Sequence, residues 1–260
     1  MTHGEDLKNK PLVEAIFELR WRLSGMPPGP VIDPNYKVLV GSLFVAMRTQ
    51  YPHHEQLATV NIPDEFVPYV IQHRFRRTVD GYPLVQLGPG IFAVNETAGY
   101  SWRTYLPRVL SATQTLRATY AAAASDSDLV PSGLSLRFIN AVPFDPSKDD
   151  VLDYLRRKLK VEMGYPPALF KPGVVEKSPS GVAIGSSHRL MIPAGVAQLR
   201  FSTAEAGGIP QLLWEMQLQS NDEDVVSFDQ LGLWLNQAHD IAREWFYVLI
   251  EGDLEAEFNK

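Results

Sequence analysis

Residues 9–23 read NKPLVEAIFELRWRL, and from Val13 onward every second residue is apolar. The apolar set is Val13, Ala15, Phe17, Leu19, Trp21 and Leu23, and the residues between them include Glu14, Glu18, Arg20 and Arg22. A period of two is typical of a β-strand with one buried face, so this stretch predicts a strand that opens the fold. We expect its charged residues on the open face of a sheet.

The composition is that of a soluble globular protein, because 45% of the 260 residues are hydrophobic and 21% are charged. The net charge of −6 disfavours broad nucleic-acid binding, which usually needs a basic face. The chain has no cysteine, which excludes disulfides, thiol nucleophiles and cysteine-ligated metals. No apolar leader or membrane-length run is present, so we expect a cytoplasmic protein with no membrane partner. No pattern predicts a metal or a cofactor.

A faint internal repeat divides the chain into residues 1–125 and 126–260. Each half reads as strand, helix, several strands and a long helix, and the stretch 125–133 (SDSDLVPSG) links the two. Strands with tight turns and alternating polarity predict an antiparallel sheet. The sequence therefore predicts an α+β fold of two duplicated β-α-β(3–4)-α halves, with helices on one face, in one continuous structural unit.

Turn and capping signals set the expected element boundaries. In the first half we expect a helix capped by Asp33, strands near 57–62, 69–79, 82–88 and 91–96, and a long helix over 100–123. Pro107 predicts a kink in that helix or its true start. In the second half we expect a strand over 134–144, a helix from Ser147 to Gly164, strands over 181–192, 196–203 and 211–220, and a closing helix over 228–250.

Four blocks of the sequence resemble a known family. They are NKPLVEAIFELRW, LVQLGPGIFAVNETAGYSW, LSLRFINAV and LNQAHDIAREWF, which cover both halves. Together they are similar to a sporadically distributed bacterial family of uncharacterised proteins of about this length. The third block departs from the commoner Arg-Tyr-Ile-Asn form, with Phe138 at the tyrosine position. The resemblance supports the fold prediction and implies no activity.

Motifs for catalysis or metal binding are weak. The HHE run at 53–55 lacks the i, i+4 spacing of a zinc helix, and we interpret it as a solvated helix end. The glycines of QLGPGIF (86–92) join two strands, so a hairpin turn is favoured over a phosphate loop. His239 in the closing helix is either a site residue at a helix–sheet junction or, as we favour, a bonded histidine at the edge of the core.

Two groups of residues lie where a pocket would have to be built. The aromatic residues Tyr100, Trp102 and Tyr105 at the start of the long helix are expected to pack on the sheet, with a pocket mouth as the alternative. Asn140, if it points towards the helices, must find hydrogen-bond partners. Arg137 is expected beside Glu14 and Glu18, where a structural ion pair is favoured over a ligand site.

Three functions follow from these patterns. The first is a non-enzymatic binding protein that uses an open sheet face or edge, with a protein partner or self-association. The second is a small-ligand or nucleic-acid binder that uses Arg74, Arg76, Arg137 and Arg200. The third is an enzyme with an unfamiliar site around Glu14, Arg137 and His239. We favour the first, because the sequence offers a wide polar sheet face and no catalytic constellation.

Overall fold

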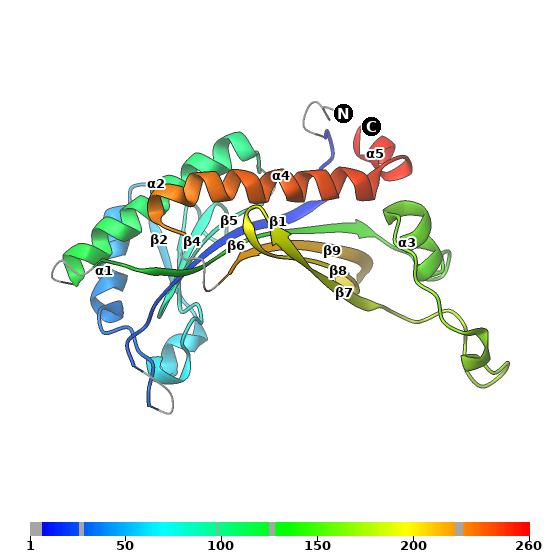
Figure 1. Cartoon of the computed structure of the whole chain (residues 1–260), viewed down its shortest axis with the longest axis horizontal. Coiled ribbons are helices and arrows are strands. Elements are labelled where there is room, and N and C mark those ends of the chain that lie inside the picture. Colours follow the sequence, from blue (N-terminus) through cyan, green and yellow to red (C-terminus); the bar gives the residue numbers. More distant parts are fainter. Residues whose placement is uncertain (1–6, 26–28, 98, 125–127, 222–225) are drawn as a thin grey trace.

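The computed structural model describes residues 7–25, 29–97, 99–124, 128–221 and 226–260. They form an α+β fold built on one antiparallel sheet of nine strands, in the order β2-β3-β4-β5-β1-β6-β9-β8-β7 (Figure 1). The strands are β1 (Leu12–Trp21), β2 (His53–Gln56), β3 (His73–Arg76), β4 (Leu84–Gly88), β5 (Ile91–Glu96), β6 (Pro131–Pro143), β7 (Ala183–Met191), β8 (Ala194–Ala206) and β9 (Ile209–Ser220). The α+β class and the antiparallel sheet are thereby confirmed.

Five α-helices lie in the described part of the chain: α1 (Tyr36–Met47), α2 (Trp102–Ala123), α3 (Val151–Leu159), α4 (Leu231–Ile250) and α5 (Asp253–Phe258). The long helices α2 and α4 run over the same face of the sheet (Figure 1). None of these helices combines the length and the apolar character needed to cross a membrane.

The opening strand β1 lies at the centre of the sheet, between β5 and β6. Ala15, Phe17 and Trp21 are fully buried on the side that the helices cover. Leu136 and Leu235 belong to the same core, which joins β6 and α4 to β1. Complete burial of each large apolar side chain contributes about 1.5–3 kcal/mol, so the alternation in β1 is a main determinant of the fold.

Several boundary predictions were wrong. The expected strand at 57–62 contains a short 3-10 helix (Ala58–Asn61), and the next strand begins only at His73. The HHE run is not a helix end, because it belongs to the edge strand β2. The prediction that the helix starts at Pro107 was also wrong, since α2 begins at Trp102 and includes this proline.

The predicted helix caps were also wrong. Asp33 does not cap α1, whose N-cap is Asn35; the Asp33 carboxylate instead accepts a hydrogen bond of 2.9 Å from the Trp21 indole. Asp150, not Ser147, caps α3. The helix α3 ends at Leu159, before a left-handed Lys160, rather than at Gly164. Part of the expected linker, residues 125–127, lies outside the described residues, and residues 131–133 belong to β6.

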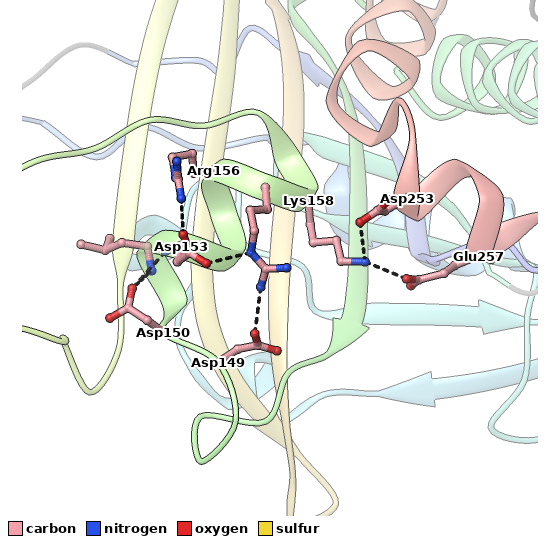
Figure 2. Close-up of polar contacts among 9 residues, drawn as sticks. Asp149, Asp150, Asp153, Arg156, Lys158, Asp253 and Glu257 are labelled. Atoms are coloured by element: carbon pink, nitrogen blue, oxygen red, sulfur yellow. Dashed lines mark hydrogen bonds and ion pairs between the residues drawn. The ribbon is translucent and has the colours of Figure 1, made fainter.

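A second core lies under α3 and α5 and is closed by ion pairs. Leu155, Trp214 and Leu254 pack together in this core. Lys158 of α3 reaches α5, where its Nζ lies 3.2 Å from an Asp253 oxygen and 2.8 Å from a Glu257 oxygen (Figure 2). The ion pairs hold α3 and α5 in register over the apolar contact, which supplies most of the stabilisation.

The first prediction concerns the cap of α3. The Asp150 carboxylate accepts hydrogen bonds from the backbone N–H groups of Leu152 and Asp153, at 2.9 and 3.0 Å. Asp150→Ala should therefore lower the free energy of unfolding by about 1 kcal/mol, as measured by urea titration. Asp149→Ala is the control, since it removes only an exposed ion pair with Arg157 and should cost less than about 0.5 kcal/mol. Equal losses for both variants would contradict the capping role.

Hydrogen bonds donated by the Ser178 hydroxyl and by the Asp153 backbone N–H lower the pKa of the Asp150 carboxyl group. A lowered folded-state pKa means that the stabilisation is present at neutral pH and is lost as the pH falls through that pKa. The difference between wild type and Asp150→Ala should therefore shrink in acid. A difference that stays constant down to the acid limit of folding would argue against this coupling.

Candidate functional site

A cavity of about 610 Å³ lies between the helices and the sheet. Its walls come from four places in the chain: the segment before β1, the start of α2, the middle of α4, and the helix-facing sides of β6 and β9. Ligand sites commonly have volumes of about 300–1,000 Å³, with mostly apolar walls and a few polar groups that orient the ligand. The residues of this cavity follow that pattern.

The floor of the cavity is formed by Phe138, Asn140 and Met216. Phe138 and Asn140 point to the helix side because they continue the alternation of the buried Leu134 and Leu136 along β6. Asn140 is only 2% exposed, and its side-chain nitrogen has no hydrogen-bond partner within the described part of the chain. A buried amide left in this state costs about 1–3 kcal/mol, so the floor carries an unused donor.

One wall is a stacked pair of rings. The Trp102 and His239 rings lie 4.0 Å apart at an angle of 5°, and the Trp102 indole donates a 3.1 Å hydrogen bond to Asn236. The His239 Nδ1 atom is 3.7 Å from an Asp240 oxygen, too far for a hydrogen bond. Burial lowers the pKa of His239 to about 4 despite the opposing effect of Asp240, so this imidazole is neutral at pH 7.

Charged residues on the cavity wall are mainly cationic. Among the described residues, Lys10, Arg103 and Arg243 line it together with one carboxylate, that of Asp240. The Lys10 ammonium donates a 2.9 Å hydrogen bond to the Tyr100 carbonyl, which holds the segment before β1 against the start of α2. Excess positive charge around a partly enclosed space raises the local concentration of anions. The protein as a whole is negative, so this local excess is a property of the cavity.

The arrangement offers a buried amide donor, a neutral imidazole and cationic groups around an apolar floor. It can hold a molecule that has a hydrogen-bond acceptor, an apolar body and a negative charge. Among the described residues, no group of three histidine, aspartate or glutamate side chains could hold a metal ion.

The predicted open-face residues of β1 lie on the side opposite the cavity. Glu14 accepts hydrogen bonds from the Asn95 amide at 2.8 Å and from the Tyr82 hydroxyl at 3.2 Å. Glu18 lies 3.9 Å from Arg20, whose guanidinium stands over the Tyr69 ring. These groups are engaged with neighbours on their own face of the sheet.

The predicted arginines form two separate pairs. Arg74 and Arg76 share Glu55, at 3.6 and 2.7 Å. Arg137 and Arg200 share Glu215, at 4.0 and 3.8 Å. Strands β4, β5 and β1 separate the two pairs, and with neighbouring strands about 4.8 Å apart this places them roughly 20 Å from each other. The four guanidinium groups therefore do not converge on one site.

The three residues of the predicted enzyme site, Glu14, Arg137 and His239, do not come together in the fold. Glu14 and Arg137 lie on the open face, whereas His239 packs against Trp102 and Phe138 on the helix side. The sheet therefore separates the Glu14 carboxylate and the Arg137 guanidinium from the His239 imidazole. Of the predicted site residues, only His239 lines the cavity.

The HHE run contributes a partly buried histidine contact away from the cavity. A 3.0 Å contact joins His54 Nε2 to His73 Nδ1. The His54 ring packs against Phe44 of α1 and Phe75 of β3, and the His73 ring packs against Tyr36 of α1. Burial is the largest cause of the lowered pKa of His73, which is about 4. The expectation of a helix end was wrong, since the run forms β2, whereas His53 and His54 are both exposed, as expected.

Sequence reasoning found part of the cavity. Asn140 was singled out for its polarity at a core position, and Tyr100 and Trp102 as an alternative pocket mouth. Lys10, Arg103 and Arg243 were missed, and the spacing of Arg243 one turn after His239 was the one local signal. Comparison with protein-family models and with curated proteins gives no match. The geometry is therefore the basis for a functional proposal.

The second prediction concerns pH. His239 and His73 have folded-state pKa values of about 4, below the usual 6.5, so the unfolded chain binds protons more readily. Stability should consequently fall as the pH drops from about 6.5 to about 4, by roughly 2–3 kcal/mol for the more enclosed His239 and by less for His73, whose shift is partly due to its neighbour His54. Urea titrations across this range should show it.

His239→Gln isolates one of the two histidines. This variant cannot take up the proton, so it should lose less stability than wild type over the same pH range. Parallel pH profiles for the variant and wild type would show that His239 is not held neutral by burial.

Proposed function

We propose that this chain is a binding protein for a small anionic molecule with an apolar body, and that the cavity between α2, α4, β6 and β9 is its site. The observation that carries the proposal is the side chain of Asn140, which lines the cavity and whose buried nitrogen has no hydrogen-bond partner among the described residues. A ligand acceptor placed on this nitrogen would remove the cost of the unmet hydrogen bond.

The walls favour an anion with a flat apolar body. Lys10, Arg103 and Arg243 supply the positive charge, and Phe138 and Met216 supply the apolar surface. The Trp102–His239 stack gives this wall a flat, stiff side. Aromatic carboxylates combine a planar apolar ring, a negative charge and acceptor oxygens, and they are the class that we propose.

The element order supports a proposal about the origin of the site. We infer that the two halves arose by duplication, since β1 and β6 each open a strand–helix–strands–helix series and pair with each other at the sheet centre. The resemblance to a bacterial family of uncharacterised proteins implies no activity, so it adds nothing to the choice of ligand.

A second candidate is a macromolecular partner on the open sheet face. The side chain of Arg200 is 57% exposed, and it lines a groove of about 260 Å³ together with Glu215 and Gly185. Because glutamates pair with the arginines on this face, an acidic protein segment or a nucleic acid would have to displace them. Arg200→Glu should abolish such an interaction in a pull-down and leave ligand binding in the cavity unchanged.

The third prediction tests the amide. Asn140→Leu replaces the unpartnered side chain by an apolar one of similar size, so it should raise the free energy of unfolding by about 1 kcal/mol. The same substitution should weaken binding of an aromatic carboxylate, such as indole-3-carboxylate, about tenfold in calorimetric titration.

Asn95→Leu is the matched control for Asn140→Leu. Asn95 is equally buried, but its side chain is hydrogen-bonded to Glu14 and Gln86 on the far face of the sheet. This variant should be less stable than wild type and should bind the carboxylate normally. If Asn140→Leu destabilised the protein as much as Asn95→Leu did, Asn140 would have a structural role and the proposal would lose its main support.

The fourth prediction tests charge. The double variant Arg103→Glu/Arg243→Glu should lose measurable affinity for the carboxylate, while wild type should prefer indole-3-carboxylate to the neutral indole-3-carboxamide. Arg117→Glu is the control, because Arg117 lies on α2 beside Phe228 and does not line the cavity. Equal binding of the acid and the amide by wild type would contradict the anionic class.

A further inference from the structure

The two edges of the sheet differ in how they are protected. One edge is β2, a strand of four residues that carries two histidines and a glutamate. The other edge is β7, a strand of nine residues in which every side chain except those of Ile184 and Leu190 is exposed. Within the described part of the chain, no strand pairs with the outer side of β7, which ends the sheet (Figure 1).

The edge strand β7 lacks the features that usually prevent pairing. Proteins protect a long edge with proline, a bulge or inward-pointing charges. β7 contains no proline, pairs with β8 through nine consecutive residues without a register shift, and has one formally charged residue, Arg189. An unprotected edge of this length is a template for another strand.

We propose that β7 pairs with β7 of a second copy of this chain, antiparallel about a two-fold axis through Ser187. This register overlaps all nine residues of both strands. It places Ile184 opposite Leu190 of the second copy, so an apolar pair forms at each end of the interface on the helix side. It also places Gly185 opposite Arg189, so that the two Arg189 side chains do not face one another.

The sequence of β7 favours this self-pairing over its neighbouring registers. A two-fold axis at Arg189 would oppose the two guanidinium groups directly, which is destabilising. An axis at Ser186 or His188 would leave Ile184 or Leu190 without its apolar partner. Ile184 packs on the second core and Leu190 on the main core, so the Ser187 register extends both apolar layers across the interface.

The geometry of the dimer follows from the pairing. In antiparallel pairing, opposite residues point to the same side of the sheet. The helices of both copies therefore lie on one side of a continuous sheet and the open faces on the other. The cavity, which lies between α2 and α4 and not at β7, keeps its access in each copy, so the proposal is independent of the ligand.

The first experiment uses the full chain and introduces either a negative or a positive charge at Ser187, which lies on the proposed two-fold axis. Light scattering after size exclusion should give a dimer for wild type, twice the 29.1 kDa of the chain. Ser187→Asp and Ser187→Lys each place two like charges about 5 Å apart across the axis and should weaken the dimer roughly tenfold or more. A mixture of the two variants should restore it. Ala204→Asp, an exposed change on β8 beyond the end of β7, should leave the dimer intact.

A cysteine provides a second test that does not depend on affinity. The chain has no cysteine, so Ser187→Cys introduces the only thiol. The expected Cα separation across the axis is about 4.5–5.5 Å, which permits a disulfide, and oxidation should give a covalent dimer. Ala204→Cys should remain a monomer on the same gel. A monomeric wild type at high concentration, or a dimer that resists both charges at Ser187, would overturn the proposal.

Discussion

The pairing of β1 with β6 is the constraint on which the rest of the structure depends. The two strands meet at the centre of the sheet with Phe17 opposite Leu136, and the other strands add outward from them. Because side chains alternate along a strand, this register decides which residues face the helices. If β1 slipped by one residue against β6, Phe17 would turn to the open face and Glu18 would take its place under the helices.

The same register produces the cavity. Asn140 lies opposite Leu12 and Trp214 and falls on the buried side because it is in phase with Leu136. A polar residue at this position opposes the general rule of an apolar core, and no neighbouring side chain satisfies its nitrogen. A sequence selected only for stability would carry an apolar residue there. Under the binding proposal, Asn140 is kept at this position for what it binds and not for what it stabilises.

Period and composition predicted the central architecture because these signals are local and strong. The alternation of β1 and the apolar stripe of α4 each depend on one stretch of sequence. Short elements could not be predicted in this way: β2 has four residues and no alternation of its own, and its position depends on pairing with β3. The cavity was only partly predictable, since Lys10, Arg103 and Arg243 come from distant segments that only the folded chain brings together.

Charge balance separates the two faces of the sheet. On the open face each predicted arginine has a glutamate within 4.0 Å, so that surface is largely neutral over short distances. Among the described residues that line the cavity, three are cationic and one is a carboxylate, in a chain whose net charge is −6. The charge around this apolar cavity is therefore opposite in sign to the net charge of the protein. This local positive charge is the physical reason to place the proposed ligand between the helices and the sheet. The sequence pattern alone favoured the polar open face of the sheet instead.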